Sequence, residues 1–376
     1  MDDAPHAVSE RRVEIDVDPL RAHTLPGWVY LDADIHQRER TAIFMRSWQY
    51  AGAAHELRNS GDYVTARLLD QNVLIMRGRD GELRGFHNVC RHRAHELLEG
   101  RGNTRVITCP YHAWSYHDDG TLRTARGAEG QPAFEAGGFC LKSVRVEVFA
   151  RKFVFFNLDP DATPMSAVAG DLAAALAADI PEFDRLVPAE PSAPSRMVAN
   201  WKVVVDNFLE CYHCGPAHPA FTDLLDMTCY RTITHGIWSH QVGDVVRAQN
   251  KAYPVDPAAR AQSARFWFLW PNITFATMPG AANMSISMML PDGLDGTTRR
   301  FQRFELPGAE RDAARAAYSR DVLGPEDVAI CESVQRGLRS LGYDSGRFVI
   351  DPSGGQNTEA AVHHFHRLYV AAMGLE

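Results

Sequence analysis

Two short segments of this chain, sixteen residues apart, each pair a cysteine with a histidine: Cys90-x-His92 and Cys109-x-x-His112. Four such side chains can bind one metal group only if the chain brings both segments together as facing loops, for example at the tips of two β-hairpins. Two thiolates and two imidazoles suit a [2Fe-2S] cluster in which the cysteines hold one iron and the histidines the other. The pattern therefore predicts a small β domain built around a pair of metal-binding loops.

Zinc is the alternative metal for these four side chains. Structural zinc sites of the Cys2His2 type usually place both cysteines before both histidines, and at other spacings. The neighbouring residues also favour iron and sulfur, because Pro110, Tyr111 and the run Trp114-Ser115-Tyr116 supply aromatic and hydroxyl groups. Such groups exclude water and donate hydrogen bonds to cluster sulfur.

A second set of candidate ligands has a different character. Glu210-x-x-His213-x-x-x-x-His218 combines two histidines with an acid, and Asp327 is a more distant carboxylate in the segment GPEDVAICESVQRGLRS. Two histidines and one carboxylate suit a ferrous iron with open positions for dioxygen. Glu326 is the runner-up for the carboxylate ligand, and helix capping is a purely structural role open to both acids.

The composition is that of a two-domain enzyme rather than a nucleic-acid-binding or membrane protein. The 376 residues are 45% hydrophobic, and the net charge of -8 arises from well-mixed charges of both signs. The segment Met1 to Glu10 has no apolar core of the kind a secretory signal needs, and no apolar run reaches membrane-spanning length. We therefore expect a cytoplasmic protein with no nucleic-acid or membrane partner.

The cysteine count of seven is odd, and two of the seven belong to the cluster motif, which argues against a disulfide framework. Cys211 and Cys214 flank His213, but thiolate ligands would close the positions that dioxygen needs, so we interpret both as packing residues. The five cysteines outside the cluster motif are all expected to be reduced thiols: Cys140, Cys211, Cys214, Cys229 and Cys331.

Changes in sequence texture divide the chain into three spans. Residues 1–48 include an amphipathic helical pattern at 31–47, which we expect to pack on the second domain. Residues 49–158 carry short alternating strands separated by turn signals such as Asp80-Gly81, which predicts an all-β domain. Residues 159–376 form the second domain.

The second domain is predicted to be of the α+β class, with helices on one face of an antiparallel sheet. An alanine-rich helix is expected at 167–178, between prolines, and another at about 201–212. Several strands follow, and two late helices are expected near 308–340 and 356–372.

Residues 90–116 resemble the cluster-binding motif of Rieske proteins, with Cys90, His92, Cys109 and His112 on the four ligand positions. This motif is shared by Rieske electron carriers and by oxygenases that contain the same domain. About 260 residues lie outside the β domain, which favours an oxygenase.

The segment NWKVVVDNFLECYHCGPAHP resembles the mononuclear-iron motif of Rieske non-haem iron oxygenases. The resemblance implies that His213 and His218 are iron ligands and that Asp327 is the third. It implies that Glu210 is the acid that bridges to the cluster of a neighbouring subunit, and it leaves Asn207 as a candidate in the outer shell. It also implies a helix-grip (Bet v1/START-like) catalytic domain and a homotrimer.

Glutamate in the bridging position indicates a substrate class, since aromatic-ring dioxygenases of this family usually carry aspartate there. The ECYHC context at 210–214 looks more like the branch that acts on quaternary ammonium compounds such as carnitine, stachydrine and glycine betaine. Aromatic-ring hydroxylation and O-demethylation are the alternatives within the family, and an electron carrier without oxygenase activity is the alternative outside it. Aromatic residues such as Phe208 and those at 266–270 are candidates for contact with an ammonium group, although core packing is the preferred interpretation of each one.

Electron counting predicts a partner. Dioxygen takes up four electrons, of which a substrate C–H bond supplies two in a monooxygenation, so NAD(P)H must supply the other two. No complete glycine-rich dinucleotide fingerprint follows a strand in this sequence. We therefore expect a separate flavin-containing iron–sulfur reductase that passes single electrons to the cluster.

Overall fold

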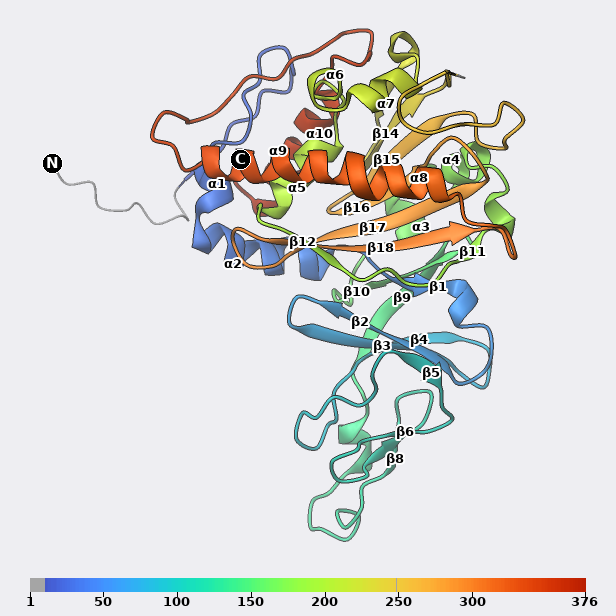
Figure 1. Cartoon of the computed structure of the whole chain (residues 1–376). Coiled ribbons are helices and arrows are strands. Elements are labelled where there is room, and N and C mark those ends of the chain that lie inside the picture. Colours follow the sequence, from blue (N-terminus) through green and yellow to red (C-terminus); the bar gives the residue numbers. More distant parts are fainter. Residues whose placement is uncertain (1–10, 248) are drawn as a thin grey trace, which may run out of the picture. The chain divides into compact units, whose positions relative to one another are not determined.

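The computed structural model describes residues 11–247 and 249–376, which form two compact units (Figure 1). The strand-rich unit contains residues 44–168, and the mixed unit combines residues 11–43 with residues 169–376. The strand-rich unit therefore extends beyond the predicted span of 49–158 at both ends. Residues 1–10, which the sequence analysis considered for a targeting signal, lie outside the described residues.

The strand-rich unit is built almost wholly from short antiparallel strands. Seven strands form one sheet in the order β1-β10-β9-β4-β3-β2-β5, and β6, β7 and β8 form a second, smaller sheet. The predicted turn at Asp80-Gly81 lies between β3 and β4, where Gly81 has a φ of 86°. The elements of this unit are η2 (Phe44–Arg46), β1 (Gln49–Ala53), η3 (Ala54–Glu56), β2 (Asp62–Leu68), β3 (Gln71–Arg77), β4 (Leu83–His87), β5 (Arg101–Asn103), β6 (Ile107–Thr108), β7 (Ser115–Tyr116), β8 (Leu122–Thr124), η4 (Ala136–Phe139), β9 (Ser143–Phe149), β10 (Phe153–Asn157) and α3 (Met165–Val168).

The mixed unit contains one antiparallel sheet in the order β11-β18-β17-β16-β15-β14-β13, with β12 also paired to β18. Its strands are β11 (Val187–Pro188), β12 (Ser195–Met197), β13 (Arg231–Thr234), β14 (Trp238–Gly243), β15 (Ala264–Leu269), β16 (Ile273–Thr277), β17 (Asn283–Pro291) and β18 (Thr297–Glu305). Its helices are α1 (Trp28–Leu31), α2 (Ala33–Ala42), α4 (Leu172–Asp179), η5 (Phe183–Arg185), α5 (Trp201–Phe208), α6 (Cys214–Ala217), α7 (Pro219–Leu224), η6 (Met227–Cys229), α8 (Ala313–Tyr318), the π-helical η7 (Ser319–Leu323), α9 (Gly324–Gly337) and α10 (Ala360–Met373). This is the predicted α+β architecture.

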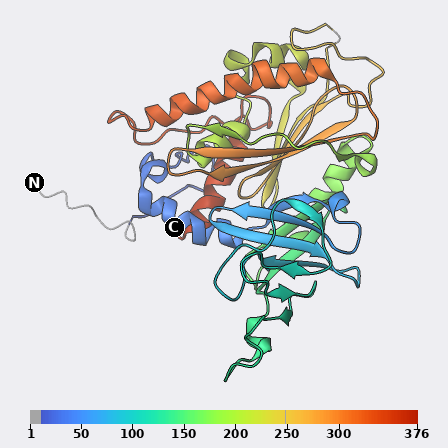
Figure 2. The same ribbon diagram turned by 60° about the horizontal axis from the view of Figure 1, so that its bottom comes forward.

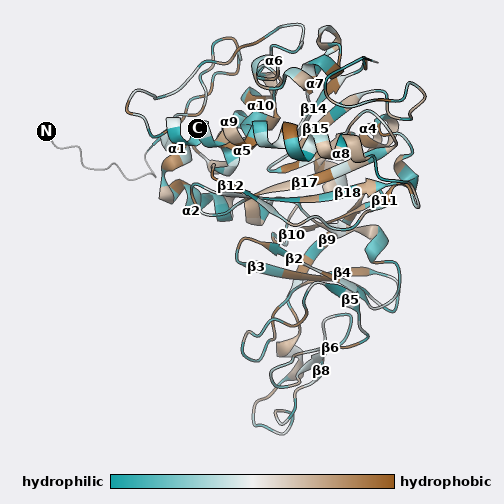
Figure 3. Ribbon diagram, in the orientation of Figure 1, coloured by the Kyte–Doolittle hydropathy of each residue, from teal (hydrophilic) through white to brown (hydrophobic). Residues whose placement is uncertain are grey.

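Helices cover one face of this sheet. Figures 1 and 2 both show α8 and α9 as one long rod along the sheet, and α5 contacts both α9 and β17. Figure 3 shows hydrophobic and hydrophilic residues interspersed along α9, as expected for a helix with one buried face. The helix predicted at 308–340 is thus interrupted by a π-helical turn, a feature often found near functional sites.

Two helices end or begin where the sequence pattern did not predict. The helix predicted at 201–212 ends at Phe208, because the Phe208 carbonyl accepts a hydrogen bond of 2.6 Å from the Gln241 side chain. In a continuing helix this carbonyl would bond to the backbone N–H of residue 212. The alanine-rich helix predicted at 167–178 is divided by Gly170, whose φ of 55° is left-handed, and α4 begins at Leu172.

A buried ion pair joins three helices of the mixed unit. The Lys202 ammonium of α5 donates to the Glu39 carboxylate of α2 at 2.5 Å, and both side chains are 1% exposed. Trp201 Nε1–H and the Tyr369 hydroxyl of α10 also donate to this carboxylate. The N-terminal residues are tied to the end of the chain as well, since the Val13 N–H donates to the Leu375 carbonyl at 2.9 Å.

No helix within the described part of the chain combines the length and the apolar character needed to cross a membrane.

Candidate metal centres

The histidines of the second ligand set lie in a short irregular segment that follows α5. His213 immediately precedes α6, and His218 lies between α6 and α7. The helix predicted at about 201–212 would have included Glu210, and this is wrong because α5 ends at Phe208. A turn brings Glu210 and His213 together instead, and one Glu210 carboxylate oxygen accepts the His213 backbone N–H at 3.1 Å.

Three potential ligand atoms converge at this segment. His213 Nε2 lies 3.1 Å from His218 Nε2, and Asp327 Oδ1 lies 3.0 Å from His218 Nε2 and 3.8 Å from His213 Nε2. Adjacent ligands of a metal with bonds of about 2.1 Å are about 3 Å apart. The three atoms therefore lie where two histidines and one carboxylate would occupy one face of a metal ion.

A glutamate contacts the far nitrogen of each histidine. Glu210 accepts a very short hydrogen bond from His213 Nδ1–H, and Glu326 accepts one of 2.8 Å from His218 Nδ1–H. Both imidazoles thus present Nε2 to the same point. Glu326, the runner-up for the carboxylate ligand, lies on the opposite side of His218 from Asp327. Asn207 Nδ2 lies 3.4 Å from His213 Nε2.

The three potential ligands favour a protonated His213 beside an ionised Asp327. Burial would lower the pKa of His213, but the nearby carboxylates of Asp327 and Glu210 raise it to about 9. Burial would raise the pKa of Asp327, but the two histidines lower it to about 2. A divalent cation bound through the Nε2 atoms would therefore displace protons from the imidazoles.

The structure corrects the prediction for the two cysteines beside His213. Cys211 and Cys214 form a disulfide, so they are not reduced packing residues. The reason is the turn after α5, in which the Cys214 N–H donates to the Cys211 carbonyl and the two Cα atoms are 4.9 Å apart. Five cysteines form no disulfide within the described residues: Cys90, Cys109, Cys140, Cys229 and Cys331.

A hollow of about 200 Å³ lies beside Glu210 in the mixed unit. Its polar wall includes Asp206, which accepts hydrogen bonds from the Tyr30 hydroxyl at 2.7 Å and from His366 Nε2–H at 3.0 Å. Glu359 lines it too, and burial, with smaller contributions from Glu210 and Asp206, raises the pKa of Glu359. This wall is rich in carboxylates.

Sequence reasoning missed several of these contacts. Gln241 fixes the end of α5 and accepts a hydrogen bond from the Tyr230 hydroxyl, yet a glutamine on a strand gives no signal. His366 of α10 contacts Asp206, one turn before Glu210. Its pairing depends on long-range folding that the sequence does not reveal.

The first ligand set occupies two loops of the strand-rich unit with the same backbone turn. The Cys90 carbonyl accepts the Ala94 N–H, and the Cys109 carbonyl accepts the Ala113 N–H, both at 3.0 Å. Each alanine has a left-handed φ, 58° and 59° respectively. Cys90 and Cys109 are buried, and both belong to the hydrophobic core of this unit.

The two histidines of these loops lie side by side near the surface. The ring centroids of His92 and His112 are 4.7 Å apart, and His92 stacks on Trp114. His112 Nδ1 is buried without a hydrogen-bond partner among the described residues, and burial followed by the Arg93 charge lowers the pKa of His112. A neutral imidazole with an inward unpartnered nitrogen fits the role of a cluster ligand.

The Tyr116 hydroxyl lies 3.3 Å from Cys90 Sγ and accepts the Arg91 N–H at 2.9 Å. Its own proton is therefore directed toward the cysteine sulfur. This is the type of contact to cluster sulfur that the sequence analysis expected from the aromatic run after His112.

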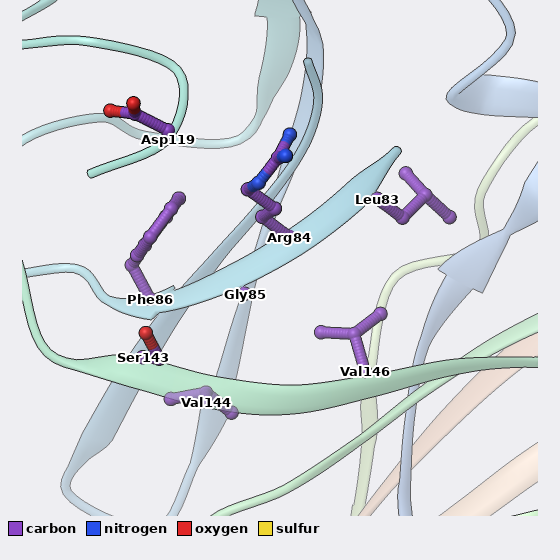
Figure 4. Close-up of a pocket in the computed structure, with 8 residues that line it drawn as sticks. All are labelled: Leu83, Arg84, Gly85, Phe86, Asp119, Ser143, Val144 and Val146. Atoms are coloured by element: carbon purple, nitrogen blue, oxygen red, sulfur yellow. The ribbon is translucent and has the colours of Figure 1, made fainter. Parts of the chain in front are cut away.

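The strand-rich unit has another pocket, of about 280 Å³, between β4 and β9. Figure 4 shows Arg84 and Phe86 of β4 near Ser143 and Val144 of β9, with Asp119 at one side. None of the four predicted cluster ligands lines it, and the Asp119 carboxylate already accepts from the Thr121 hydroxyl at 2.6 Å. It is not the candidate site.

Comparison with known proteins assigns each of the two units to a protein family. Residues 47–135 match the Rieske [2Fe-2S] domain, and residues 183–375 match the catalytic domain of ring-hydroxylating alpha subunits. The carnitine monooxygenase oxygenase subunit of Escherichia coli K12 is 37% identical over 357 residues, or 93% of this chain and 94% of that protein. The chloroplastic choline monooxygenase of Arabidopsis thaliana is 30% identical over 361 residues, or 93% and 82%.

Similar solved structures support the same assignment of the two units. A quaternary ammonium Rieske monooxygenase, studied for carnitine oxidation by gut microbiota and for inter-subunit electron transfer, superposes with a TM-score of 0.87 at 33% identity, over 96% of this chain and 100% of that one. Naphthalene 1,2-dioxygenase from Rhodococcus shares the fold, with a TM-score of 0.80 at 19% identity over 93% of this chain and 94% of that one.

The fold and the two ligand sets define an oxidoreductase in which a Rieske domain and a mononuclear-iron catalytic domain share one chain. The chain belongs to the Rieske non-haem iron oxygenases, as a terminal oxygenase (alpha) subunit. A Rieske [2Fe-2S] cluster and a mononuclear iron are the cofactors that this family membership implies.

Proposed function

We propose that this chain uses dioxygen to hydroxylate or oxidatively N-demethylate a small quaternary ammonium compound of the betaine or carnitine type. The observation that carries the proposal is the convergence of His213, His218 and Asp327 beside Glu210, in a chain whose relatives include carnitine and choline monooxygenases. Glutamate at position 210 supports the same substrate class.

The proposal assigns the metal ligands as follows. His213, His218 and Asp327 hold the mononuclear iron, and the four side chains of the paired loops hold the cluster: Cys90, His92, Cys109 and His112. The donor atoms support this assignment, because Nε2, Nε2 and a carboxylate oxygen suit ferrous iron, while two thiolates and two imidazoles suit a Rieske cluster. When bound, the iron offers positions for dioxygen and the cluster supplies single electrons.

Glu210 is proposed to connect the two centres. It orients His213 through Nδ1 and lies at the edge of the carboxylate-rich hollow. In a ring of three subunits, this hollow would receive the cluster loops of a neighbour, where His92 is exposed and Arg91 and Arg93 flank the histidine. Opposite charges on the two surfaces support the contact. Glu210 would then hydrogen-bond an imidazole on each side.

Electrons are proposed to come from NAD(P)H through a separate flavin and iron–sulfur reductase. On an N-methyl group, hydroxylation yields a product that breaks down to an amine and formaldehyde, whereas hydroxylation at another carbon leaves an alcohol. A cytoplasmic location, where NAD(P)H and such a reductase are present, is part of this proposal.

The decisive experiment combines the iron-loaded protein with a surrogate reductase, NADH and dioxygen. L-Carnitine, γ-butyrobetaine, glycine betaine and choline are compared with naphthalene and a methoxy-aromatic acid. We expect NADH consumption and either formaldehyde or an alcohol only with members of the first group. Turnover of the aromatic compounds alone would contradict the proposal. If the wild type and His213→Ala react equally with all compounds, the chain is an electron carrier instead.

A further inference from the structure

The face of the mixed-unit sheet that carries the metal site can be identified from strand register. Phe266, Ala276, Ser285 and Arg303 lie opposite one another on β15 to β18, so they share a face. The Phe266 ring contacts the Phe208 ring at the end of α5, with centroids 6.2 Å apart, which places this row under the helices. Odd-numbered residues of β18 therefore point toward the metal site.

Part of this helix-facing side is accessible. Ala276, Ser285 and Phe301 on this side retain part of their accessible surface, whereas Ser287 and Met289 on the same side are 3% exposed. Close-packed interiors leave almost no accessible area. Packing on this side is therefore incomplete beside Phe301.

Arg299 is a basic side chain on this helix-facing side. Its Nε–H donates to the Ser287 hydroxyl at 3.2 Å, and its guanidinium lies 5.3 Å from the centre of the Phe301 ring. The Asp327 carboxylate is near enough to influence the pKa of Arg299, which burial lowers. A guanidinium stays charged under such a shift.

The guanidinium has no counterion of its own. No carboxylate among the described residues is within ion-pairing distance of Arg299, and its terminal nitrogens make no hydrogen bond there. Two other arginines of this sheet are ion-paired, Arg265 with Asp179 at 2.9 Å and Arg303 with Glu305 at 3.5 Å. A largely buried charge without a partner is costly, and an anionic ligand would remove the cost.

We infer that Arg299 binds the carboxylate of the substrate, so that the site selects quaternary ammonium carboxylates over quaternary ammonium alcohols or esters. The inference rests on the proposed function and makes it narrower. The guanidinium fork matches a carboxylate in geometry, and the Ser287 hydroxyl holds the fork in place. Phe208, Phe266 and Phe301, all partly buried on the same side, offer aromatic faces to the ammonium group.

The test compares two compounds that differ only in charge at one end, γ-butyrobetaine and its methyl ester. Each is titrated calorimetrically, without dioxygen, into iron-loaded wild type and Arg299→Gln. We expect the wild type to bind γ-butyrobetaine roughly 30-fold or more tightly than the ester. In Arg299→Gln, the affinity for γ-butyrobetaine should fall by a similar factor, and the affinity for the ester should change little.

Two further variants keep the test interpretable. Arg300→Gln removes the next arginine of β18, whose side chain lies on the other side of the sheet, and should bind both compounds as the wild type does. Arg299→Lys keeps the charge without the fork, and should give intermediate discrimination even if Arg299→Gln does not fold. Unchanged affinity of either Arg299 variant for γ-butyrobetaine would overturn the inference.

Turnover separates failure of this inference from failure of the proposed function. If choline and the ester are oxidised as well as γ-butyrobetaine, the enzyme acts on quaternary ammonium compounds but Arg299 does not select for a carboxylate. If no quaternary ammonium compound binds or stimulates NADH consumption, the proposed function fails and the inference fails with it.

Discussion

At the scale of single residues, the mononuclear site is organised by two carboxylate–imidazole pairs. Glu210 contacts Nδ1 of His213, and Glu326 contacts Nδ1 of His218. Sequence reasoning found both histidines and named Asp327 as the third ligand, with Glu326 as the runner-up. The two acids are adjacent on α9, and the contact of Glu326 with His218 Nδ1 could be seen only in three dimensions.

Because Asp327 and Glu326 lie on opposite sides of His218, we expect substitutions at these two positions to lower the affinity for iron to different extents. Asp327→Asn removes a proposed ligand and should abolish stoichiometric Fe(II) binding. Glu326→Gln leaves all three ligands and weakens only the support of His218, so affinity should fall roughly 10- to 100-fold. Anaerobic Fe(II) titration of both variants measures this. If Glu326→Gln loses more iron than Asp327→Asn, the assignment of the third ligand has to be exchanged.

A substitution at Glu210 should distinguish electron transfer from metal binding. Glu210→Gln should retain the iron and the cluster, as measured by metal analysis and by the cluster's visible absorption, because it removes neither ligand set. Coupled turnover should be lost, because the amide no longer provides an anionic bridge between two imidazoles. Full activity of this variant would remove Glu210 from the proposed electron route.

At the scale of elements, the junction of α2, α5 and α10 depends on Glu39. Burial would raise its pKa, but Lys202, His36 and Trp201 together lower it to about 2 from an ordinary value of 4.5. Because the folded-state pKa is depressed, the stabilisation is fully present above pH 4.5 and is lost as the pH falls toward 2. The buried lysine has no other carboxylate partner in the described part of the chain.

Glu39→Gln should therefore lower the free energy of unfolding by about 3 to 5 kcal/mol at pH 7, since it leaves the Lys202 charge buried and unpaired. The difference from the wild type should shrink between pH 4.5 and pH 2. Urea denaturation followed by tryptophan fluorescence at pH 7 and pH 3 would measure both effects. Equal denaturation midpoints at pH 7 would show that the pair contributes no net stability.

Prediction of elements from sequence succeeded where the signal was local. Alternating strands and the Asp80-Gly81 turn identified the strand-rich unit, and apolar periodicity identified most helices of the mixed unit. It failed at the end of α5, where the Gln241 side chain takes the Phe208 carbonyl from the helix. The disulfide between Cys211 and Cys214 followed from that same unforeseen turn. The first error arises from a contact between residues 33 positions apart, and the second follows from the turn that this contact produces.

At the scale of the whole molecule, the proposed route of electrons between subunits can be tested by mixing two inactive variants. His112→Ala should lose the cluster, and His213→Ala should lose the mononuclear iron. If electrons cross between neighbours, coexpressed variants should recover about a quarter of the wild-type rate when assembly is random, because each mixed trimer then has one productive interface of three. If each chain used its own cluster, mixed trimers would be as inactive as either parent.

The order of the two units along the chain was predictable, because each ligand motif is compact in sequence. The residue pairs that join the two segments of the mixed unit were not predictable, although residues 1–48 were expected to pack on the second domain. Residues 11–43 belong to it together with residues 169–376, and the contacts that join them, such as Lys202 with Glu39, link residues more than 160 positions apart. The pattern of residues 31–47 indicated an amphipathic helix with an apolar side that packs on the second domain, but it did not identify the residues that this side contacts.

The discontinuity of the mixed unit has a consequence for biosynthesis. The strand-rich unit is a continuous stretch that ends at residue 168, so a ribosome releases all of it before most of the other unit exists. The helices at residues 28–42 must wait for α10, the last helix of the described chain, before their apolar side is covered. The unit that carries the proposed cluster site can therefore fold early in translation, and the unit that carries the mononuclear-iron site can be completed only after α10 has been made.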